Sequence, residues 1–411
     1  IPLAALIKPD DADKFIYYYA SQREYNFEIT ANAAHSTLRV FFSTIKLFII
    51  EFTPLGFFVL LYGIFDSWKK DKKICITLSV ITLSNIFLII NYRGAEQDIP
   101  SLLHYLFPSY IAMSIWIGLG LHSIYIFLKA RLRHPLLPSL ALIVLPLICL
   151  ITHYHQSDRS KNFILFDYAN NILDTLPPYS ILFTAGNSLS GPLQYFQIKS
   201  GNQDTLILID RELLSRDPYC QYLLNRFPNI TPRNILSIPP EARFFHYLDA
   251  NISKQPIFAT FSIPEQYENT PHGLVYRILP KGASLEFEKV KEANDALWQH
   301  YTQRGLLDAR VFKDHMLKEI VDAYGRSKSN LGLYYSSRDR VEEAIEEYET
   351  SLKYNPDNFA SLFNLGQLYM QNNKPEKGRA LLAKATEIDP DFFLRQDSSA
   401  EAHQTSNDTI L

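Results

Sequence analysis

The sequence has little cysteine and no excess of positive charge. Three cysteines in 411 residues cannot support a disulfide-framed scaffold. Forty Lys and Arg residues against 43 Asp and Glu residues give a net charge of −3, which offers no electrostatic case for a nucleic-acid partner. C-x-x-C, H-E-x-x-H and EF-hand motifs are all missing, so we assign no metal site, although a divalent metal is not excluded. No cofactor is evident from the sequence.

Apolar residues are concentrated between positions 40 and 152. They form four runs, 47–65, 74–90, 105–128 and 135–152, and a helix needs ~20 residues to cross a bilayer. Because a backbone in lipid must satisfy its own hydrogen bonds, these runs predict helices. We therefore expect a multi-span α-helical membrane domain over 47–152, with four transmembrane helices and the lipid bilayer as a partner.

Loop charge predicts the topology of these spans. Four lysines lie at 69–73, between the first two runs, and Lys129, Arg131 and Arg133 lie between the last two. The positive-inside rule places both loops in the cytoplasm. Everything after 152 is then periplasmic or lumenal, at a bacterial inner membrane or the ER. Segment 1–46 shares that outer face, and its part 33–45 suits either an interfacial helix or an extension of the first span.

A soluble α/β domain is predicted over 153–282. Strands at 180–184 and 205–209 flank a glycine turn and a helix at 192–198, which makes a βαβ unit with parallel pairing. Further strands are expected at 234–238, 256–260 and 274–278, and helices at 217–227 and 240–251. The turn contains Gly186 and Asn187, and it is either a structural turn or an anion site at a helix start.

A helical connector at 283–326 leads into the clearest repeat in the chain, at 327–395. Six positions recur after ~34 residues, the tetratricopeptide period. The two sets are Leu331, Gly332, Tyr335, Ala344, Tyr348 and Pro356, and then Leu365, Gly366, Tyr369, Gly378, Leu382 and Pro390. Small residues let two antiparallel helices approach, large ones fill the space between them, and proline ends the second helix. Two such repeats predict a protein-binding module, and the polar tail 396–411 is expected to be disordered.

Ionisable residues near the predicted membrane surface are the candidates for chemistry. Glu51 lies inside the first run, where a carboxylate is a functional candidate unless it reaches the interface. The predicted outer loop carries Arg93, Glu96, Asp98 and His104. This loop is either an ordinary solvated segment or a place where Arg93 holds a lipid-linked phosphate.

Several stretches together resemble a known family. They are Glu51-Phe-Thr-Pro-Leu-Gly56, Phe107-Pro-Ser-Tyr110, Ile115-Trp-Ile-Gly-Leu-Gly120, Ile181-Leu-Phe-Thr-Ala-Gly186, Pro192-Leu-Gln-Tyr195 and Gly273-Leu-Val-Tyr-Arg277. With the terminal repeats, they make residues 45–395 resemble protein O-mannosyltransferases that have a GT-C-type membrane domain, a family with bacterial relatives of unknown function. The family usually has acidic residues after the glycine of the βαβ turn, whereas Asn187-Ser-Leu-Ser190 stands here.

The resemblance implies a glycosyltransferase that moves a hexose such as mannose from a polyprenyl-phosphate donor to a protein hydroxyl. It makes Glu51, Arg93, Glu96, Asp98 and His104 candidates for donor binding. The family's catalytic aspartate lies in the first outer loop, so we expect it upstream of Ile1 and expect this sequence to be a C-terminal portion. The alternative is a non-catalytic, membrane-anchored adaptor that binds partner proteins through its repeats.

Overall fold

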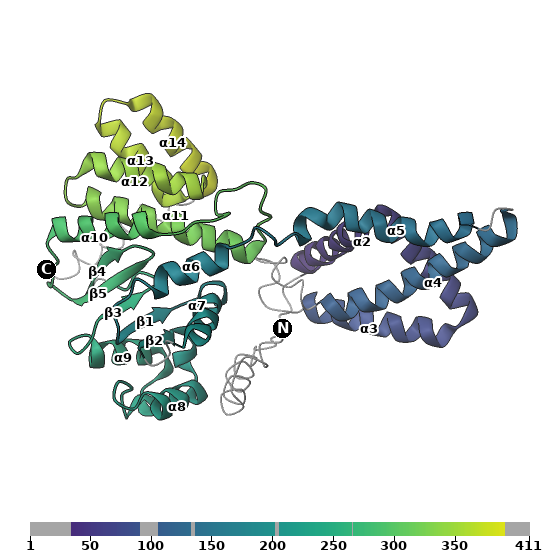
Figure 1. Cartoon of the computed structure of the whole chain (residues 1–411), viewed down its shortest axis with the longest axis horizontal. Helices are drawn as coiled ribbons and strands as arrows, with labels where there is room; N and C mark the ends of the chain where they lie inside the picture. Colours follow the sequence, from purple (N-terminus) through teal and green to yellow (C-terminus); the bar gives the residue numbers. More distant parts are fainter. Residues whose placement is uncertain (1–33, 91–105, 133–135, 202–204, 265, 391–411) are drawn as a thin grey trace, which may run out of the picture. The chain divides into compact units, whose positions relative to one another are not determined.

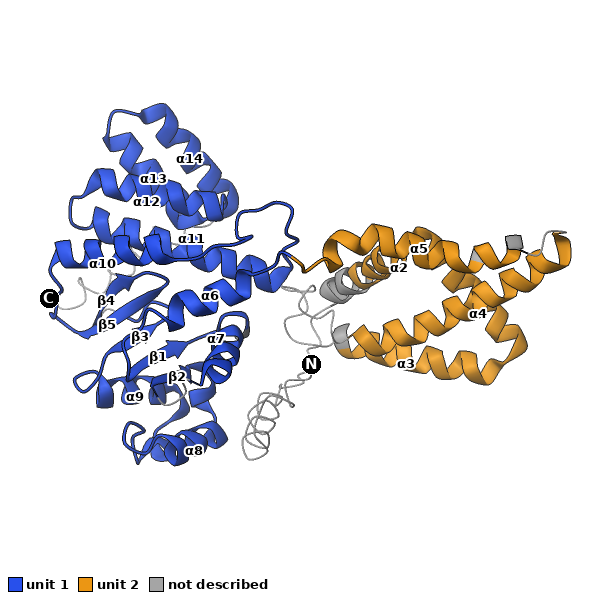
Figure 2. Cartoon of the chain, viewed as in Figure 1, with its two compact units in different colours: residues 1–22, 161–411 blue, residues 23–160 orange. Residues whose placement is uncertain are grey.

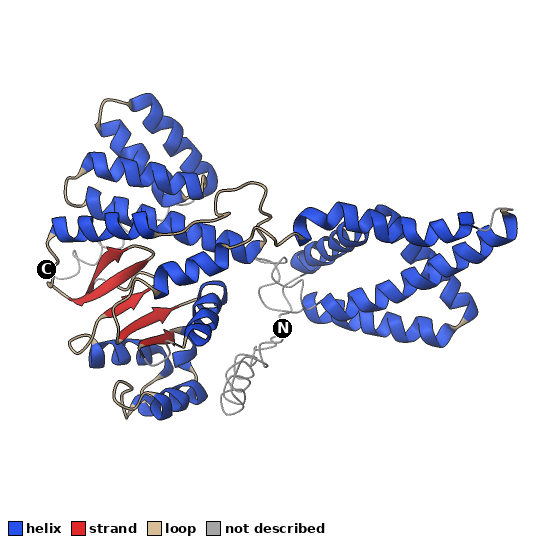
Figure 3. Cartoon of the chain, in the orientation of Figure 1, coloured by secondary structure: helices blue, strands red, loops and turns tan. Residues whose placement is uncertain are grey.

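The computed structural model describes residues 34–90, 106–132, 136–201, 205–264 and 266–390. The chain divides into two compact units, 23–160 and 1–22 with 161–411 (Figure 2). The first is built of helices alone in its described part, whereas the second also contains a sheet (Figure 3). The predictions for 1–33, for the tail 396–411 and for Arg93, Glu96, Asp98 and His104 lie outside the described residues.

The helical unit contains α2 (Ala34–Lys70), α3 (Lys72–Ile90), α4 (Phe107–Arg131) and α5 (Leu136–Ser157) (Figure 1). Among the described residues, three helical stretches have the length and apolar composition of a membrane span: Phe42–Lys70, Phe107–Arg131 and Pro138–Ser157. The expected second span forms α3, which is not among the three. It is 19 residues long and begins with Lys72 and Lys73. The four-span arrangement is therefore not confirmed.

Helix α2 starts at Ala34 and continues into the segment predicted as the first span. Whether residues 34–45 lie along the membrane surface or extend that span stays a prediction. Farther along, α2 crosses α4 at two glycines. A Cβ on Gly63 would overlap the carbonyl oxygen of Trp116, and one on Gly120 would lie 2.6 Å from the carbonyl oxygen of Val59. Such close backbone approach is typical of helix pairs that meet through small residues in membranes.

The second unit is organised around a five-stranded sheet of order β2-β1-β3-β5-β4. Strands β1 (Ser180–Thr184), β2 (Leu206–Asp210) and β3 (Ile257–Ala259) pair in parallel. Strand β5 (Val275–Pro280) is antiparallel to β3 and to β4 (Tyr267–His272). Helix α7 (Asn187–Ser200) connects β1 to β2, so the predicted βαβ unit is present. The expected strand at 234–238 is wrong, because this segment forms the 3₁₀ helix η5 (Ile235–Ser237).

Helices cover both faces of this sheet. On one face, Leu182 and Phe258 share a core with α6 (Ile164–Leu173), α7 and the first half of α11 (His315–Ser336). On the other, Ile181 and Phe183 pack with η4 (Glu212–Ser215), α8 (Asp217–Arg226) and α9 (Arg243–Asn251), the last of which follows η6 (Pro240–Ala242). This division follows from the alternation of side chains along a strand, and it gives three layers.

The helical connector and repeats follow as α10 (Phe287–His300), α11, α12 (Val341–Tyr354), α13 (Phe359–Gln371) and α14 (Pro375–Ile388) (Figure 1). Helix α11 belongs to two cores. Ile320 and Tyr324 pack under the sheet, whereas Leu331 and Tyr335 pack among the repeat helices. The expected boundary between connector and repeats, at 326 and 327, thus falls inside one continuous helix.

The repeat positions face one another in pairs. A Cβ on Gly332 would lie 2.9 Å from a ring carbon of Tyr348, and one on Gly366 would lie 2.9 Å from Cγ of Leu382. A Cβ on Gly378 would lie 2.7 Å from the carbonyl oxygen of Gly366. Of the remaining positions, Leu331, Tyr335, Ala344, Leu365 and Tyr369 are buried, and Pro356 and Pro390 follow the ends of α12 and α14. This is the small-against-large packing that the repeat spacing predicts.

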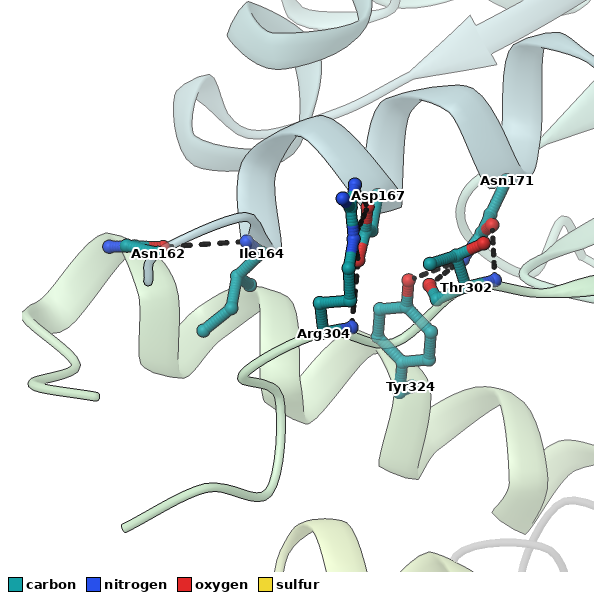
Figure 4. A network of polar contacts seen from close by, with 7 residues as sticks. All are labelled: Asn162, Ile164, Asp167, Asn171, Thr302, Arg304 and Tyr324. Carbon is teal, nitrogen blue, oxygen red and sulfur yellow. Dashed lines mark hydrogen bonds and ion pairs between the residues drawn. The ribbon is translucent and has the colours of Figure 1, made fainter. Parts of the chain in front are cut away.

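A polar network fixes α6 to the segment that precedes α11 (Figure 4). The buried carboxylate of Asp167 accepts hydrogen bonds from the backbone N–H of Arg304 at 2.7 Å and from its Nη2 at 2.6 Å. The amide of Asn171 donates to the carbonyl oxygen of Thr302 and to the hydroxyl of Tyr324, both at 2.8 Å. Helix α6 is therefore held to residues more than a hundred positions away.

Candidate functional site

The most unusual backbone in the helical unit is a break in α2 at Thr53. Its φ of 62° and ψ of 159° are not helical, and Pro54 follows. Proline lacks an N–H and disfavours helical geometry in the residue before it, which explains why the break falls here. A β-branched residue at positive φ costs about 1–3 kcal/mol, and such strain gathers at functional sites. The Thr53 hydroxyl accepts the N–H of Gly56 at 3.4 Å and so starts the second part of the helix.

The break frees carbonyl oxygens that α5 contacts. Nε2 of His153 lies 3.2 Å from the carbonyl oxygen of Ile50, and Sγ of Cys149 lies 3.9 Å from that of Phe52. Nδ1 of His153 also lies 2.9 Å from the carbonyl oxygen of Cys149. A neutral imidazole donates from one nitrogen only, so only a protonated ring donates to both oxygens. Interrupted helices at membrane depth persist where neighbours satisfy the freed groups in this way.

Helix α4 adds a tyrosine to the same place. The Tyr110 ring packs against Phe48 and Phe52, with ring centroids 5.4 Å and 5.8 Å apart. Its hydroxyl is within electrostatic reach of Glu51 and, within the described ranges, has no hydrogen-bond partner. We call Glu51, Thr53, Tyr110 and His153 the helix-break site. A carboxylate, a phenol and an imidazole from three helices can bind a polar headgroup or relay a proton.

Sequence reasoning identified Glu51 but missed Tyr110 and His153 as members of this site. A Thr-Pro pair inside an apolar run is a signal for a helix interruption, and it was available. Tyr110 also stood in a stretch that carried the family resemblance. His153 gave no local signal, because its partner Ile50 is 103 residues away.

The glycine turn in the second unit has an open space but an unsuitable charge for an anion. Gly186 has a φ of 82° and directly precedes α7, whose first residue is Asn187. A Cβ on Gly186 would meet only Oε1 of Glu319, at 3.8 Å. A carboxylate this close opposes a bound phosphate, although free N–H groups at a helix start favour one. Anion binding at this turn remains a prediction.

Beside this turn, polar residues line the carboxyl ends of the parallel strands. Thr184 and Asp210 are paired in register, and Thr260 donates its N–H to the carbonyl oxygen of Phe183 on the other side of β1. The hydroxyls of Thr184 and Thr260 have no hydrogen-bond partner in the described part of the chain. Ligands of open α/β sheets bind at this edge. Here Thr184 and Asp210 are 0% and 2% exposed, so the edge is closed over by the protein.

Two titratable groups of this edge have strongly shifted pKa values. Burial, with a smaller contribution from the like charge of Glu212, raises the pKa of Asp210 to about 6. Burial, together with the charge of Arg277, lowers the pKa of His272 to about 4. The Asp210 carboxylate also accepts the N–H of Glu212, the first residue of η4, at 2.9 Å. Across the described residues, no group of three or more His, Cys, Asp or Glu side chains is placed to hold a metal.

The described elements define a protein with apolar helices of membrane-spanning length, a small α/β unit and a helical repeat region. Comparison with known proteins agrees with this class. The tetratricopeptide repeat family matches residues 337–398, which confirms the repeats expected from the sequence.

Among known proteins, the sequence of this chain is similar to that of the protein O-mannosyl-transferase tmem260 of Dictyostelium discoideum. The two are 22% identical over 373 residues, a match that covers 77% of this chain and 45% of that protein. This chain therefore spans less than half the length of the relative it matches. No solved structure matches the chain. The resemblance to protein O-mannosyltransferases that the sequence motifs indicated is confirmed as a distant one.

Proposed function

We propose that this chain is part of a membrane glycosyltransferase that transfers a hexose, such as mannose, from a polyprenyl-phosphate donor to protein hydroxyls on the non-cytoplasmic side. The observation that carries the proposal is the extent of the match to an O-mannosyl-transferase. At 77% of the chain, it has to include parts of both compact units, since neither unit accounts for that share alone. A match to the repeats alone would not support an enzymatic function.

In this proposal the helix-break site supplies polar groups inside an otherwise apolar unit. Glu51 and Tyr110 accept and donate hydrogen bonds to the donor's sugar or to the acceptor hydroxyl. The described residues of the site include no Lys or Arg, so the donor phosphate requires a cation from elsewhere in the chain. Arg93, with Glu96, Asp98 and His104 nearby in sequence, is our candidate for that role. We assign the catalytic base to no residue of this chain.

The repeats take the second role, recruitment of the acceptor protein. Tetratricopeptide helices form extended surfaces that bind peptides, which supports this assignment. Capture of the acceptor beside the membrane raises its effective concentration at the transferase site.

The test is sugar transfer by membranes that contain the protein, with a radiolabelled polyprenyl-phosphate hexose and secreted acceptor proteins. Glu51→Gln and Arg93→Ala should each reduce transfer at least tenfold, the loss expected from about 1.4 kcal/mol of binding or barrier. Glu241→Gln, an exposed change in η6 of the α/β unit, is the matched control and should leave transfer unchanged. Unchanged transfer by both Glu51→Gln and Arg93→Ala would remove these residues from the mechanism.

The runner-up is a non-catalytic, membrane-anchored adaptor, which the repeat match favours by itself. The two functions separate in one comparison. If membranes with the protein transfer no sugar above membranes without it, yet the protein still retains a secreted partner through its repeats, the adaptor function replaces the enzyme.

A further inference from the structure

An exposed cluster marks the start of the α/β unit, where the chain leaves α5. We name it the junction patch, and it consists of Lys161, Phe163, Phe166, Arg304, Leu307 and Arg310. Phe163 and Phe166 are 40% and 41% exposed, and Leu307 is 55% exposed. Large apolar side chains and cationic ones therefore alternate over a surface that contributes little to the core.

Contacts show that these residues form one surface. The Arg304 guanidinium lies 4.2 Å from the ring centre of Phe163 and 5.6 Å from that of Phe166. Figure 4 shows the Arg304 side chain reaching toward α6, where its guanidinium meets Asp167. A Cβ on Gly305 would lie 3.1 Å from the carbonyl oxygen of Lys161, so the segment that carries Leu307 and Arg310 starts beside Lys161.

The pKa of Asp308 agrees with the position of Lys161 and Arg310 on one surface. Hydrogen bonds from Arg310, and the nearby charge of Lys161, lower the pKa of Asp308 to about 2. Asp308 pairs with Arg310 at 2.8 Å, and Asp167 pairs with Arg304 at 2.6 Å. Both arginines thus already have a carboxylate partner, and Lys161 is the cation with the least compensation.

The covalent chain limits how far this patch can be from a bilayer. The third apolar helix of membrane-spanning character ends at Ser157, six residues before Phe163. A fully extended chain covers ~3.5 Å per residue, so Phe163 lies within about 20 Å of the end of that helix. If α5 crosses the membrane, the patch is confined to the layer of water next to the lipid headgroups.

We propose that the junction patch rests on the bilayer surface, with Phe163, Phe166 and Leu307 in the headgroup region. Aromatic rings together with Lys and Arg side chains are the groups that prefer this interface, since each has an apolar body and a polar end. Because the arginines are paired, the contact is mainly apolar and depends little on headgroup charge. The inference rests on the proposed membrane crossing, and it adds that the α/β unit has a defined membrane-facing surface.

Spin labelling of the full chain in phosphatidylcholine proteoliposomes tests the proposal. A nitroxide is placed at Leu307→Cys in a background in which Cys75, Cys149 and Cys220 are alanine. Leu333→Cys on α11 is the matched control, because Leu333 is also 55% exposed. At position 307, collisions with oxygen relative to a water-soluble nickel chelate should be several-fold more frequent than at 333. Addition of phosphatidylglycerol should change this ratio less than twofold.

A double variant, Phe163→Ser with Phe166→Ser, should return the label at 307 to the aqueous ratio while the thermal unfolding of the protein stays cooperative. Equal ratios at 307 and 333 in the folded, reconstituted protein would overturn the proposal. Shielding of position 307 from both oxygen and nickel would also overturn it, since it would indicate a protein neighbour. A label at Ile115→Cys on α4 separates the two levels of inference, because an aqueous ratio there would refute the membrane crossing itself.

Discussion

Asp210 and His272 give opposite contributions to stability over the same pH range. The pKa of Asp210 rises from 3.8 to about 6 on folding, and that of His272 falls from 6.5 to about 4. Each difference corresponds to about 3 kcal/mol of pH-dependent stability. Between about pH 4 and 6 the folded state holds the Asp210 proton longer than the unfolded state, so this residue makes stability fall as pH rises. The unfolded state protonates His272 first, so this residue makes stability rise over about pH 4 to 6.5.

Removal of one titrating group, Asp210 or His272, should make the pH dependence of stability due to the other measurable. In Asp210→Asn, the amide oxygen still accepts the N–H of Glu212, but the titration is lost. Relative to the wild type, this variant should gain about 3 kcal/mol of stability as the pH rises from about 4 to 6. For a unit of this size that gain is about 6–12 °C in Tm. The assay is thermal unfolding of the full chain in detergent, followed by near-ultraviolet circular dichroism at a series of pH values.

Other titrating carboxylates contribute equally to the stability curve of every variant, so their contributions cancel when two curves are subtracted. His272→Gln should show the opposite difference, a loss relative to the wild type's pH dependence as pH rises through the same window. The double variant should restore the wild-type slope. A difference curve for Asp210→Asn that is flat from about pH 4 to 6 would show that burial does not shift the pKa of this carboxyl, and the reasoning would be refuted.

Four further substitutions test the packing. Gly63→Leu should prevent stable assembly of the helical unit, because even a Cβ overlaps the carbonyl oxygen of Trp116. Size-exclusion profiles in detergent measure this assembly, and a normal profile would contradict the close crossing of α2 and α4. Thr53→Gly should raise or maintain stability, because glycine relieves a strain of about 1–3 kcal/mol at φ 62°, and a lower Tm for this variant would argue against strain. Pro54→Ala should alter proteolysis near the break in α2. Gly332→Val should destabilise the repeats by about 1–3 kcal/mol through contact with Tyr348, seen as faster amide exchange in α11 and α12, and unchanged exchange would contradict that packing.

Patterns with a strong local period were predictable from the sequence. The apolar runs became helices, and the strands at 180–184 and 205–209 became the parallel pair β1 and β2. The repeat spacing located α12 to α14, because small and large residues recur at positions that pack against each other. In each of these cases a single segment carries enough information for its own conformation.

Elements whose conformation depends on neighbouring elements were harder to predict from the sequence. Strand β4 contains Pro271 and several polar residues, so no apolar alternation marks it, and it persists as an edge strand paired only to β5. The apolar stretch at 234–238 has prolines on both sides, and these favour the short turn of η5 over a strand. The helix-break site joins Glu51, Tyr110 and His153 from separate helices, an arrangement that only tertiary packing produces.

The dual membership of α11 has a mechanical consequence. One end of this helix is clamped under the sheet by Tyr324 and Asn171, and the other end forms the first wall of the repeats through Leu331 and Tyr335. If the repeats bind a partner protein, as we propose, α11 holds that partner at a fixed angle to the sheet. A truncated protein designed to isolate the repeats therefore has to begin before His315, because a later start would remove part of α11, which the sheet and the repeats share.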